Sequence, residues 1–448
     1  MSSVVGSLEN YYVALSKAVA DGTKSNNQLL KFDIICNVDQ LLDRMSKTEL
    51  DNNASKWISL LIKSIITSLS TKQTPPNTKS ALAEVLGIIF KNSKTLAIVF
   101  MSESFQLFVR LIKASEAKVG CMRAIGMMLE SIGASGNPIH LECFKLIKSI
   151  YPTATNTNDF KLECLSSVVP IVKHYNNTDI KMDGLDQKIL NFILKATLDV
   201  TSVVGGGSAD PASNIDSPNS TNKRASELLG CLLASLFYKD NNHSTTTTTT
   251  GGIVKSNILS GQRSHWTLEN CLQFIGNQFI STNKKEIKIN LSIAYCQLLQ
   301  NIKLLDLEKE IDSILSHLLK LLGSSNRNLS TAQDQAQTRT SVSYILRHGL
   351  GQNLSENGQQ SMVRYFTNII SQADTFNELT IVVSLKELSQ LLLQLGEGGI
   401  VQYDDLSTYM FSLLNDRNQS TRQWSAIGLR SLASNIPKLT YKFDTGGV

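Results

Sequence analysis

The sequence predicts an all-α protein built from helical hairpins that stack side by side. Three observations lead to this prediction. Apolar residues recur at the three- and four-residue spacing of an amphipathic helix along nearly the whole chain. Alternating strand-like runs bounded by hairpin turns are missing. The eight prolines lie mainly next to the periodic segments, where a missing amide hydrogen costs little.

Composition limits the class of protein further. The chain has 448 residues, of which 42% are hydrophobic and 18% charged, and this apolar content excludes global disorder. A prior of about 150 residues per domain allows roughly three globular units or one elongated array. The net charge of +5 is weak for this length, which argues against a dedicated nucleic-acid binder.

The predicted helices follow one another from the N-terminus. Residues 8–20 form the first candidate, which ends at Asp21-Gly22. The next is 58–69, with a stripe of Ile58, Leu61, Ile62, Ile65, Ile66 and Leu69. Pro170 lies inside the periodic segment 162–175 and predicts a kink or a break there. Further along, 311–322 repeats the stripe with Ile311, Ile314, Leu315, Leu318, Leu319 and Leu322.

Two segments interrupt the periodic pattern. Residues 205–223 are rich in Gly, Ser, Asn and Pro, and residues 239–264 contain a threonine tract. Both are predicted to be loops, and a neutral insertion is favoured over a regulatory one. The predicted organisation is N-terminal repeats in 1–204, a loop in 205–223, a helix of the array in 224–238, a loop in 239–264 and C-terminal repeats in 265–448.

Successive helices pair into hairpins of about 40 residues, which is typical of HEAT and armadillo arrays. In the clearest hairpin, residues 409–414 end one helix, 415–418 form the turn and 420–434 form the second helix. The fold class is therefore an α-solenoid of HEAT/armadillo-like helical hairpins.

Two charged residues of this last hairpin are the candidate structural residues. Asp416 can cap the turn, and Arg422 can reach an acceptor in the turn or in the adjoining repeat. The small residues Ala426 and Gly428 allow close approach of neighbouring helices. The buried stripe of the helix is predicted to consist of Ala426, Leu429, Leu432 and Ala433.

Residues that could carry chemistry are scattered. The seven cysteines form no CxxC pair, so buried free thiols in a reducing compartment are favoured over a metal site or disulfide framework. His140 and Cys143, with Glu142 adjacent, could share a helix face, but no third ligand is placed beside them, and a surface or capping histidine is favoured. The basic cluster of Lys284, Lys285 and Lys288 is interpreted as a solvated face rather than a site for acidic lipid or peptide.

The sequence contains no phosphate-binding loop and no nucleophile elbow. We therefore predict no catalytic, cofactor-binding or metal site, no small-molecule substrate and no enzymatic activity. Neither a signal peptide nor a stretch close to the roughly 18 apolar residues of a membrane span is found, so a soluble, cytoplasmic protein is expected.

Several blocks resemble the HEAT-repeat-containing protein 5 family, the large accessory proteins of the clathrin adaptor. They are ILSHLLKLL at 314–322, RTSVSYILRHGL at 339–350, VVSLKELSQL from Val382 and the helix of Trp424, in that order. Near the start, TPPNTK from Thr74 leads into ALAEVL from Ala81 and resembles the N-terminal region of the same family. Members of the family are several times longer, so the resemblance places this chain in their N-terminal part.

The resemblance implies a non-enzymatic scaffold in clathrin-adaptor-linked membrane trafficking, including endosome-to-Golgi sorting, endocytosis and protein localisation. The implied partners are clathrin adaptor protein complex 1 and its accessory proteins, with peripheral membrane association through them at the trans-Golgi network, endosomes and endocytic vesicles. The alternative is another solenoid role, as a nuclear transport receptor or a phosphatase scaffold. Transport receptors usually have acidic inner faces, and the sequence pI of about 8.7 disfavours that role.

Overall fold

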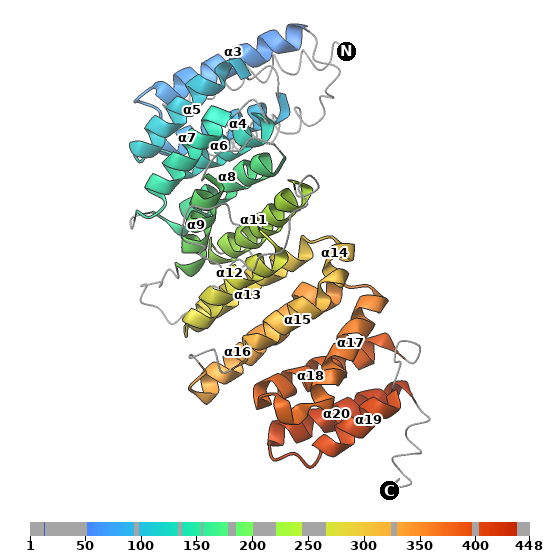
Figure 1. Ribbon diagram of the computed structural model, residues 1–448. Coiled ribbons are helices and arrows are strands. Elements are labelled where there is room, and N and C mark those ends of the chain that lie inside the picture. The colour runs from blue at the N-terminus through green and yellow to red at the C-terminus, as the bar shows by residue number, and fades with distance from the viewer. Residues whose placement is uncertain are drawn as a thin grey trace. The chain divides into compact units, whose positions relative to one another are not determined.

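The computed structural model describes Val13 and residues 52–93, 98–132, 137–153, 156–177, 185–199, 221–243, 266–323, 329–396 and 403–436. These residues form 17 α-helices and no strand, which confirms the all-α class (Figure 1). None of the described helices combines the length and the apolar character that a bilayer span requires. The helix predicted for 8–20 lies outside the described residues, apart from the helical Val13.

The chain divides into two compact units. The first consists of Met1–Phe192 and Asp216–Arg224, and the second of Ile193–Ile215 and Ala225–Val448. The division passes through two helices, α9 (Leu185–Leu198) and α11 (Thr221–His243). Helix α11 is longer at both ends than the helix predicted for 224–238, because its polar first and last turns carry no apolar period. The remaining residues of the two predicted loops, 205–220 and 244–264, lie outside the described residues.

The first unit is a stack of helical hairpins. Its helices are α3 (Asn52–Ser70), α4 (Pro76–Ser93), α5 (Ile98–Lys113), α6 (Lys118–Ile132), α7 (Asn137–Ile150) and α8 (Asn158–Asn177). Helix α3 packs on α4, α5 on α6 and α7 on α8, while α4, α6 and α8 also contact one another in order. We call α4, α6 and α8 the second-helix layer of the first unit. Helix α8 is not broken at Pro170.

The second unit repeats this plan. Its helices after α11 are α12 (Leu268–Ser281), α13 (Lys285–Gln300), α14 (Leu304–Lys309), α15 (Ile311–Lys320), α16 (Ala332–Tyr344), α17 (Glu356–Ser371), α18 (Glu378–Leu395), α19 (Tyr403–Leu413) and α20 (Gln419–Asn435). Helix α16 continues into a π-helical turn, η3 (Ile345–Leu350), and a 3-10 turn, η4 (Gly351–Asn353); a further 3-10 turn, η5 (Ala373–Thr375), precedes α18.

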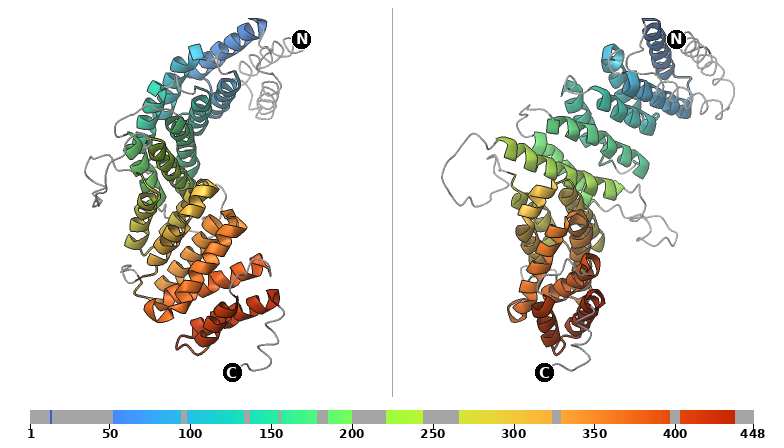
Figure 2. Two further views of the ribbon diagram at one scale, coloured as in Figure 1. Left: turned by 45° about the vertical axis from the view of Figure 1, so that its right-hand side comes forward. Right: turned by 90° about the vertical axis from the view of Figure 1, so that its right-hand side faces the viewer.

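Two layers are present in the second unit. Helices α13, α16–η3, α18 and α20 contact one another in order and form its second-helix layer, whereas α12, α15, α17 and α19 form its first-helix layer. The stacked helices of this unit, coloured yellow to red, are seen from two further sides in Figure 2.

Local sequence explains where these helices begin and what they bury. Polar side chains cap the N-termini of five helices in the second unit, and each such cap contributes about 1 kcal/mol. The capping residues are Thr267, Thr331, Ser355, Asn377 and Asn418. The predicted stripes of 58–69 and 311–322 are buried in full, which confirms both.

Candidate protein-interaction surfaces

Glycines set the spacing of the second-helix layer in the first unit. A Cβ atom at Gly120 would lie 2.4 Å from the carbonyl oxygen of Ser80, and one at Gly87 would lie 2.7 Å from Cα of Ala124. Helices α4 and α6 therefore approach each other so closely that even a methyl group would force their backbones apart. The close packing holds successive repeats at a fixed distance and brings their exposed side chains next to one another.

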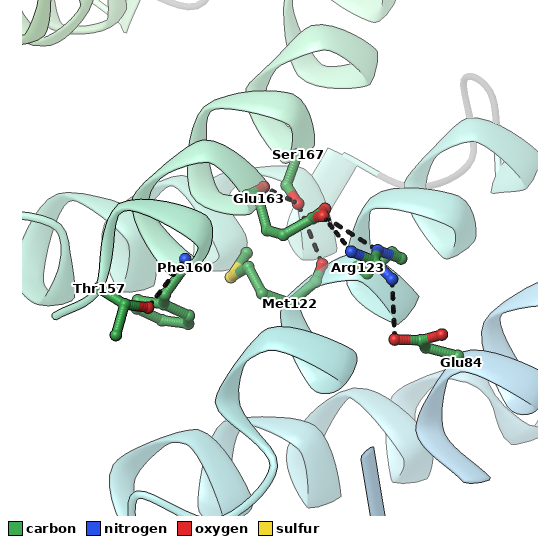
Figure 3. Close-up of polar contacts among 7 residues, drawn as sticks. All are labelled: Glu84, Met122, Arg123, Thr157, Phe160, Glu163 and Ser167. Atoms are coloured by element: carbon green, nitrogen blue, oxygen red, sulfur yellow. Dashed lines mark hydrogen bonds and ion pairs between the residues drawn. The ribbon is translucent and has the colours of Figure 1, made fainter. Parts of the chain in front are cut away.

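A polar ladder crosses this layer. Arg123 on α6 donates from Nη1 to Oε1 of Glu84 on α4 at 2.9 Å, and from Nε and Nη2 to Oε1 of Glu163 on α8 at 3.0 and 2.7 Å (Figure 3). Ser167 on α8 adds a hydrogen bond of 3.1 Å from its hydroxyl to the carbonyl oxygen of Met122. The pairs of Arg123 are 39 and 40 residues apart in the sequence, so one guanidinium joins three successive repeats.

The charged groups of the ladder interact mainly with one another, as in a network that stabilises the fold. The Arg123 guanidinium has its pKa raised, mainly by the hydrogen bond to Glu163. Burial raises the pKa of the Glu84 carboxyl, against the attraction of Arg123. The Arg123 side chain is 43% exposed, so each pair contributes at most about 1 kcal/mol. The ladder fixes the register of the repeats, and its groups are already paired with each other.

The second unit has the same register. Arg347 on η3 forms two parallel hydrogen bonds with Glu387 on α18, 2.8 Å from Nε and 3.1 Å from Nη2. Asn418 before α20 donates to Glu378 at the start of α18 at 2.8 Å. Both pairs are 40 residues apart. Close approach again occurs at a glycine, since a Cβ at Gly428 would lie 2.8 Å from the Met410 side chain.

One strip of this layer combines half-buried cations and a half-buried tryptophan with exposed apolar side chains. Lys386 on α18 places Nζ 5.8 Å from the ring centroid of Trp424 on α20. The pKa of Lys386 is lowered, and burial is the largest cause. Glu387 raises this pKa, whereas Arg347 and Arg339 lower it, so both arginines act on the same ammonium group. Exposed apolar side chains continue the strip one or two turns along the two helices. We define the basic-aromatic strip as Arg339, Arg347, Lys386, Leu393, Trp424 and Ile427.

The structure places Asp416 in the turn before α20 and Arg422 in the first turn of that helix. Asp416 accepts a hydrogen bond of 2.7 Å from the backbone amide of Asn418, and Arg422 donates from Nη1 to the carbonyl oxygens of Asp416 at 2.8 Å and Arg417 at 3.0 Å. Asn418, which the sequence analysis missed, caps α20 and makes the hydrogen bond to Glu378. Its signal in the sequence is an Asn directly before the helix, the preferred type of residue at that position.

The stripe predicted for α20 is partly wrong. Ala426 is exposed and Ala433 is only half-buried, while Leu429 and Leu432 are buried as predicted. The buried positions include Ser425, which is fully buried and donates its hydroxyl hydrogen bond to the carbonyl oxygen of Met410. Because Ser425 is polar, the apolar pattern does not include it, and the predicted stripe starts one position too late, at Ala426.

Two predictions about titratable side chains are also wrong. His140 is fully buried on α7 rather than at the surface, and Glu142 is exposed beside the buried Cys143, so the three do not converge. Lys288 does not belong to a solvated face. It is 1% exposed, and Nζ lies 2.8 Å from the Thr338 hydroxyl and 5.7 Å from the Phe279 ring, because α16 covers this face of α13.

The cysteines follow the prediction where the structure describes them. The six described cysteines form no disulfide: Cys121, Cys143, Cys164, Cys271 and Cys296 are buried, and Cys231 is half-buried. Burial raises the pKa of the Cys121 and Cys296 thiols to about 12, which keeps them protonated. Cys36 lies outside the described residues. Within the described ranges, no three His, Cys, Asp or Glu side chains are grouped to hold a metal ion.

Comparison with known proteins finds matches among solved structures only, and these concern the fold of the chain. No protein-family model and no curated protein sequence matches the chain. Among solved structures, Kap121p bound to Nup53p matches with a TM-score of 0.52 and 13% identity, over 96% of this chain and 38% of that chain. Kap121p alone matches with a TM-score of 0.51 and 12% identity, over 97% and 39%. The karyopherin Kap121p bound to the extreme C-terminus of the protein phosphatase Cdc14p matches with a TM-score of 0.50 and 12% identity, over 94% and 38%.

At this level of identity the likeness concerns the fold alone, and it confirms the predicted α-solenoid of HEAT-like hairpins. The chain spans less than two fifths of the length of the matched chains. Membership of the HEAT-repeat-containing protein 5 family is not shown by any of these matches.

Proposed function

We propose that this chain is a non-enzymatic scaffold that binds protein partners through its second-helix layers. The observation that carries the proposal is the register of 39 and 40 residues, which aligns the exposed side chains of successive repeats. A partner lying across such a layer gains modest contacts from several repeats at once. The polar groups of the ladder hydrogen-bond to one another and hold the layer together. The proposal therefore gives them a structural role and assigns no catalytic group.

The finer proposal is a role in clathrin-adaptor-linked sorting between endosomes and the trans-Golgi network. It is supported by the resemblance of the sequence blocks to the HEAT-repeat-containing protein 5 family. Those blocks lie in α15, in α16 with η3, in α18 and in α20. Clathrin adaptor protein complex 1 and its accessory proteins are the proposed partners, and they would bring the cytoplasmic chain to the membrane surface.

A second candidate is favoured by a different observation, the likeness of the fold to a karyopherin. The matched structures hold Nup53p in one case and the end of the phosphatase Cdc14p in another. By analogy, the chain would act in nuclear transport or as a phosphatase scaffold. The fold alone supports this candidate.

Affinity purification of the tagged full chain separates these proposals. The expected result is that adaptor subunits are recovered with the tagged chain. Imaging of a fluorescent fusion should then show perinuclear puncta. Recovery of nucleoporins with staining of the nuclear rim would favour the second candidate. A folded chain that captures no protein above a tag-only control would contradict the scaffold proposal itself.

A further inference from the structure

The second-helix layer of the second unit carries more cations than carboxylates. Helix α20 contains no acidic residue, and the acidic residues of α16 and α18 lie mostly in their first turns. The cations of α16–η3, α18 and α20 are Arg339, Arg347, Lys386, Arg422 and Arg430, and the carboxylates are Asp334, Glu378 and Glu387. This part of the layer therefore attracts anions.

Each of the three carboxylates already has a partner. Asp334 accepts from the Thr331 hydroxyl at 2.6 Å, and Glu378 accepts from Asn418 at 2.8 Å. Glu387 is buried, with a side chain 4% exposed, and is paired with Arg347. An uncharged partner does not cancel the charge of a carboxylate, so five cations against three carboxylates leave this part of the layer with a positive surplus of two.

Lys386 has the Glu387 carboxylate nearby, but neither it nor Arg339 makes a direct ion pair in the described part of the chain. Among the described residues, no carboxylate oxygen lies within 4.0 Å of either side chain. Arg347 and Arg339 lower the pKa of Lys386 and Glu387 raises it, so three cations and one carboxylate act on one another at this point of α18. Glu387, which is paired with Arg347, offsets one of the three positive charges, so the other two still repel each other and attract an anion.

Apolar side chains border these cations. The indole of Trp424 lies beside the Lys386 ammonium, and Ile427 follows one turn later on the same helix with 42% of its surface exposed. On α18, Leu393 follows Lys386 by two turns and is 55% exposed. A ligand that fits the strip therefore carries both negative charge and apolar surface.

We infer that the basic-aromatic strip binds an acidic protein segment, whose carboxylates pair with Lys386 and Arg339 and whose apolar side chains pack on Trp424 and Ile427. The inference rests on the proposed scaffold function and names the chemistry of one partner. A single-stranded nucleic acid would need a longer basic groove with several aromatic stacking residues, whereas the strip has one tryptophan. A membrane surface would need cations that extend freely from the fold, whereas Lys386 is half-buried between neighbouring helices.

The test uses the full chain and a fluorescent peptide of alternating Glu, Asp and Leu residues. A peptide with Gln and Asn in place of Glu and Asp is the uncharged control. Binding is measured by fluorescence anisotropy at low and high salt for the wild type and the double variant Lys386→Glu/Arg339→Glu. Arg364→Glu on α17, an exposed residue of the first-helix layer, is the control for a charge reversal outside the strip, with half the change of net charge of the double variant. Arg347 is left intact, because its loss would strand the buried Glu387.

We expect the double variant to bind the acidic peptide at least about tenfold more weakly, and Arg364→Glu to stay within about twofold of the wild type. Binding of the wild type should weaken with salt, and the uncharged peptide should bind poorly. Circular dichroism melting verifies that the variants are folded, and Lys386→Gln, which only removes a charge, should give an intermediate loss.

Equal binding of both peptides, or no loss in the folded double variant, would overturn the inference. Tighter binding to polyuridylate or to phosphatidylserine vesicles than to the peptide would also overturn it, in favour of RNA or lipid. If the double variant still captures the partners of the wild type, this inference fails while the scaffold function stands. If the wild type captures no partner, the scaffold function fails.

Discussion

A half-buried histidine shows how single side chains hold the second unit together. The Tyr295 hydroxyl on α13 donates to the carbonyl oxygen of Leu272 at 3.1 Å and lies 2.9 Å from Nε2 of His317 on α15. One hydroxyl group thus links three helices. Burial lowers the pKa of His317 to about 4, with Lys320 acting in the same direction.

The lowered pKa of His317 predicts a pH dependence of stability. Above the ordinary value of 6.5 the imidazole is neutral in both folded and unfolded chains, so it has no effect. As pH falls below 6.5, His317 binds a proton in the unfolded chain but stays neutral in the folded chain. The free energy of unfolding therefore decreases until pH reaches about 4. The loss by about pH 5 is about 2 kcal/mol for this group.

Urea unfolding at about pH 7.5 and about pH 5 measures this effect. The variant His317→Gln keeps a hydrogen-bonding group near Tyr295 but does not titrate, so it should lose less stability than the wild type over the same interval. An identical pH dependence in both proteins would mean that His317 is not the responsible group.

Close packing at glycine makes a second prediction at this scale. Gly120→Ala should destabilise the chain by about 2 kcal/mol, since the new methyl group would meet backbone atoms of Ser80. Gly126→Ala is the matched comparison on the same helix, because its Cβ would meet only the Ser167 hydroxyl at 3.0 Å. Thermal unfolding should rank Gly120→Ala below Gly126→Ala, and the opposite order would contradict the close approach of α4 and α6.

The ion pairs that join helices of successive repeats contribute unequally to the free energy of unfolding. Glu387 is buried, whereas Arg123 and its partners are partly exposed. Arg347→Met should therefore cost about 3 kcal/mol by leaving Glu387 without its paired cation, and Arg123→Met, which loses two partly exposed pairs, should cost less than about 2 kcal/mol.

Denaturant unfolding of both variants tests this difference. Adding Glu387→Gln to Arg347→Met removes the stranded charge and should restore part of the stability. If Arg123→Met is as costly as Arg347→Met, burial does not decide the strength of these pairs.

The sequence predicted elements well where apolar residues alone define the buried face. The stripes at 58–69 and 311–322 are of this kind. It failed where buried positions are polar, as at Ser425, or where a long side chain is covered by a neighbouring repeat, as at Lys288. Burial of that kind depends on long-range packing, which no local period contains.

The partners of Arg123 could have been anticipated in part. Glu84 and Glu163 lie one predicted hairpin length before and after it, so opposite charges spaced by about 40 residues were a usable signal. What the sequence alone could not supply is the rotation of each helix about its axis. That rotation decides which of several charged residues in a repeat face each other.

For the whole molecule, the account makes one central claim, that partners bind on the second-helix layers. Because the repeats share a common register, the exposed residues of these layers are regularly spaced. A partner can therefore contact several repeats at once, and each repeat needs to contribute only a small part of the binding free energy. The first-helix layers also carry exposed lysines, such as Lys113 on α5 and Lys320 on α15. The two layers of each unit therefore serve as internal controls for each other.

The most direct test is lysine cross-linking of the full chain to the partners it captures. In the first unit it compares Lys91 on α4 with Lys113 on α5, and in the second unit Lys386 on α18 with Lys320 on α15. The account predicts partner cross-links at Lys91 or Lys386 and few at Lys113 and Lys320. Cross-links concentrated at Lys113 and Lys320 would contradict it.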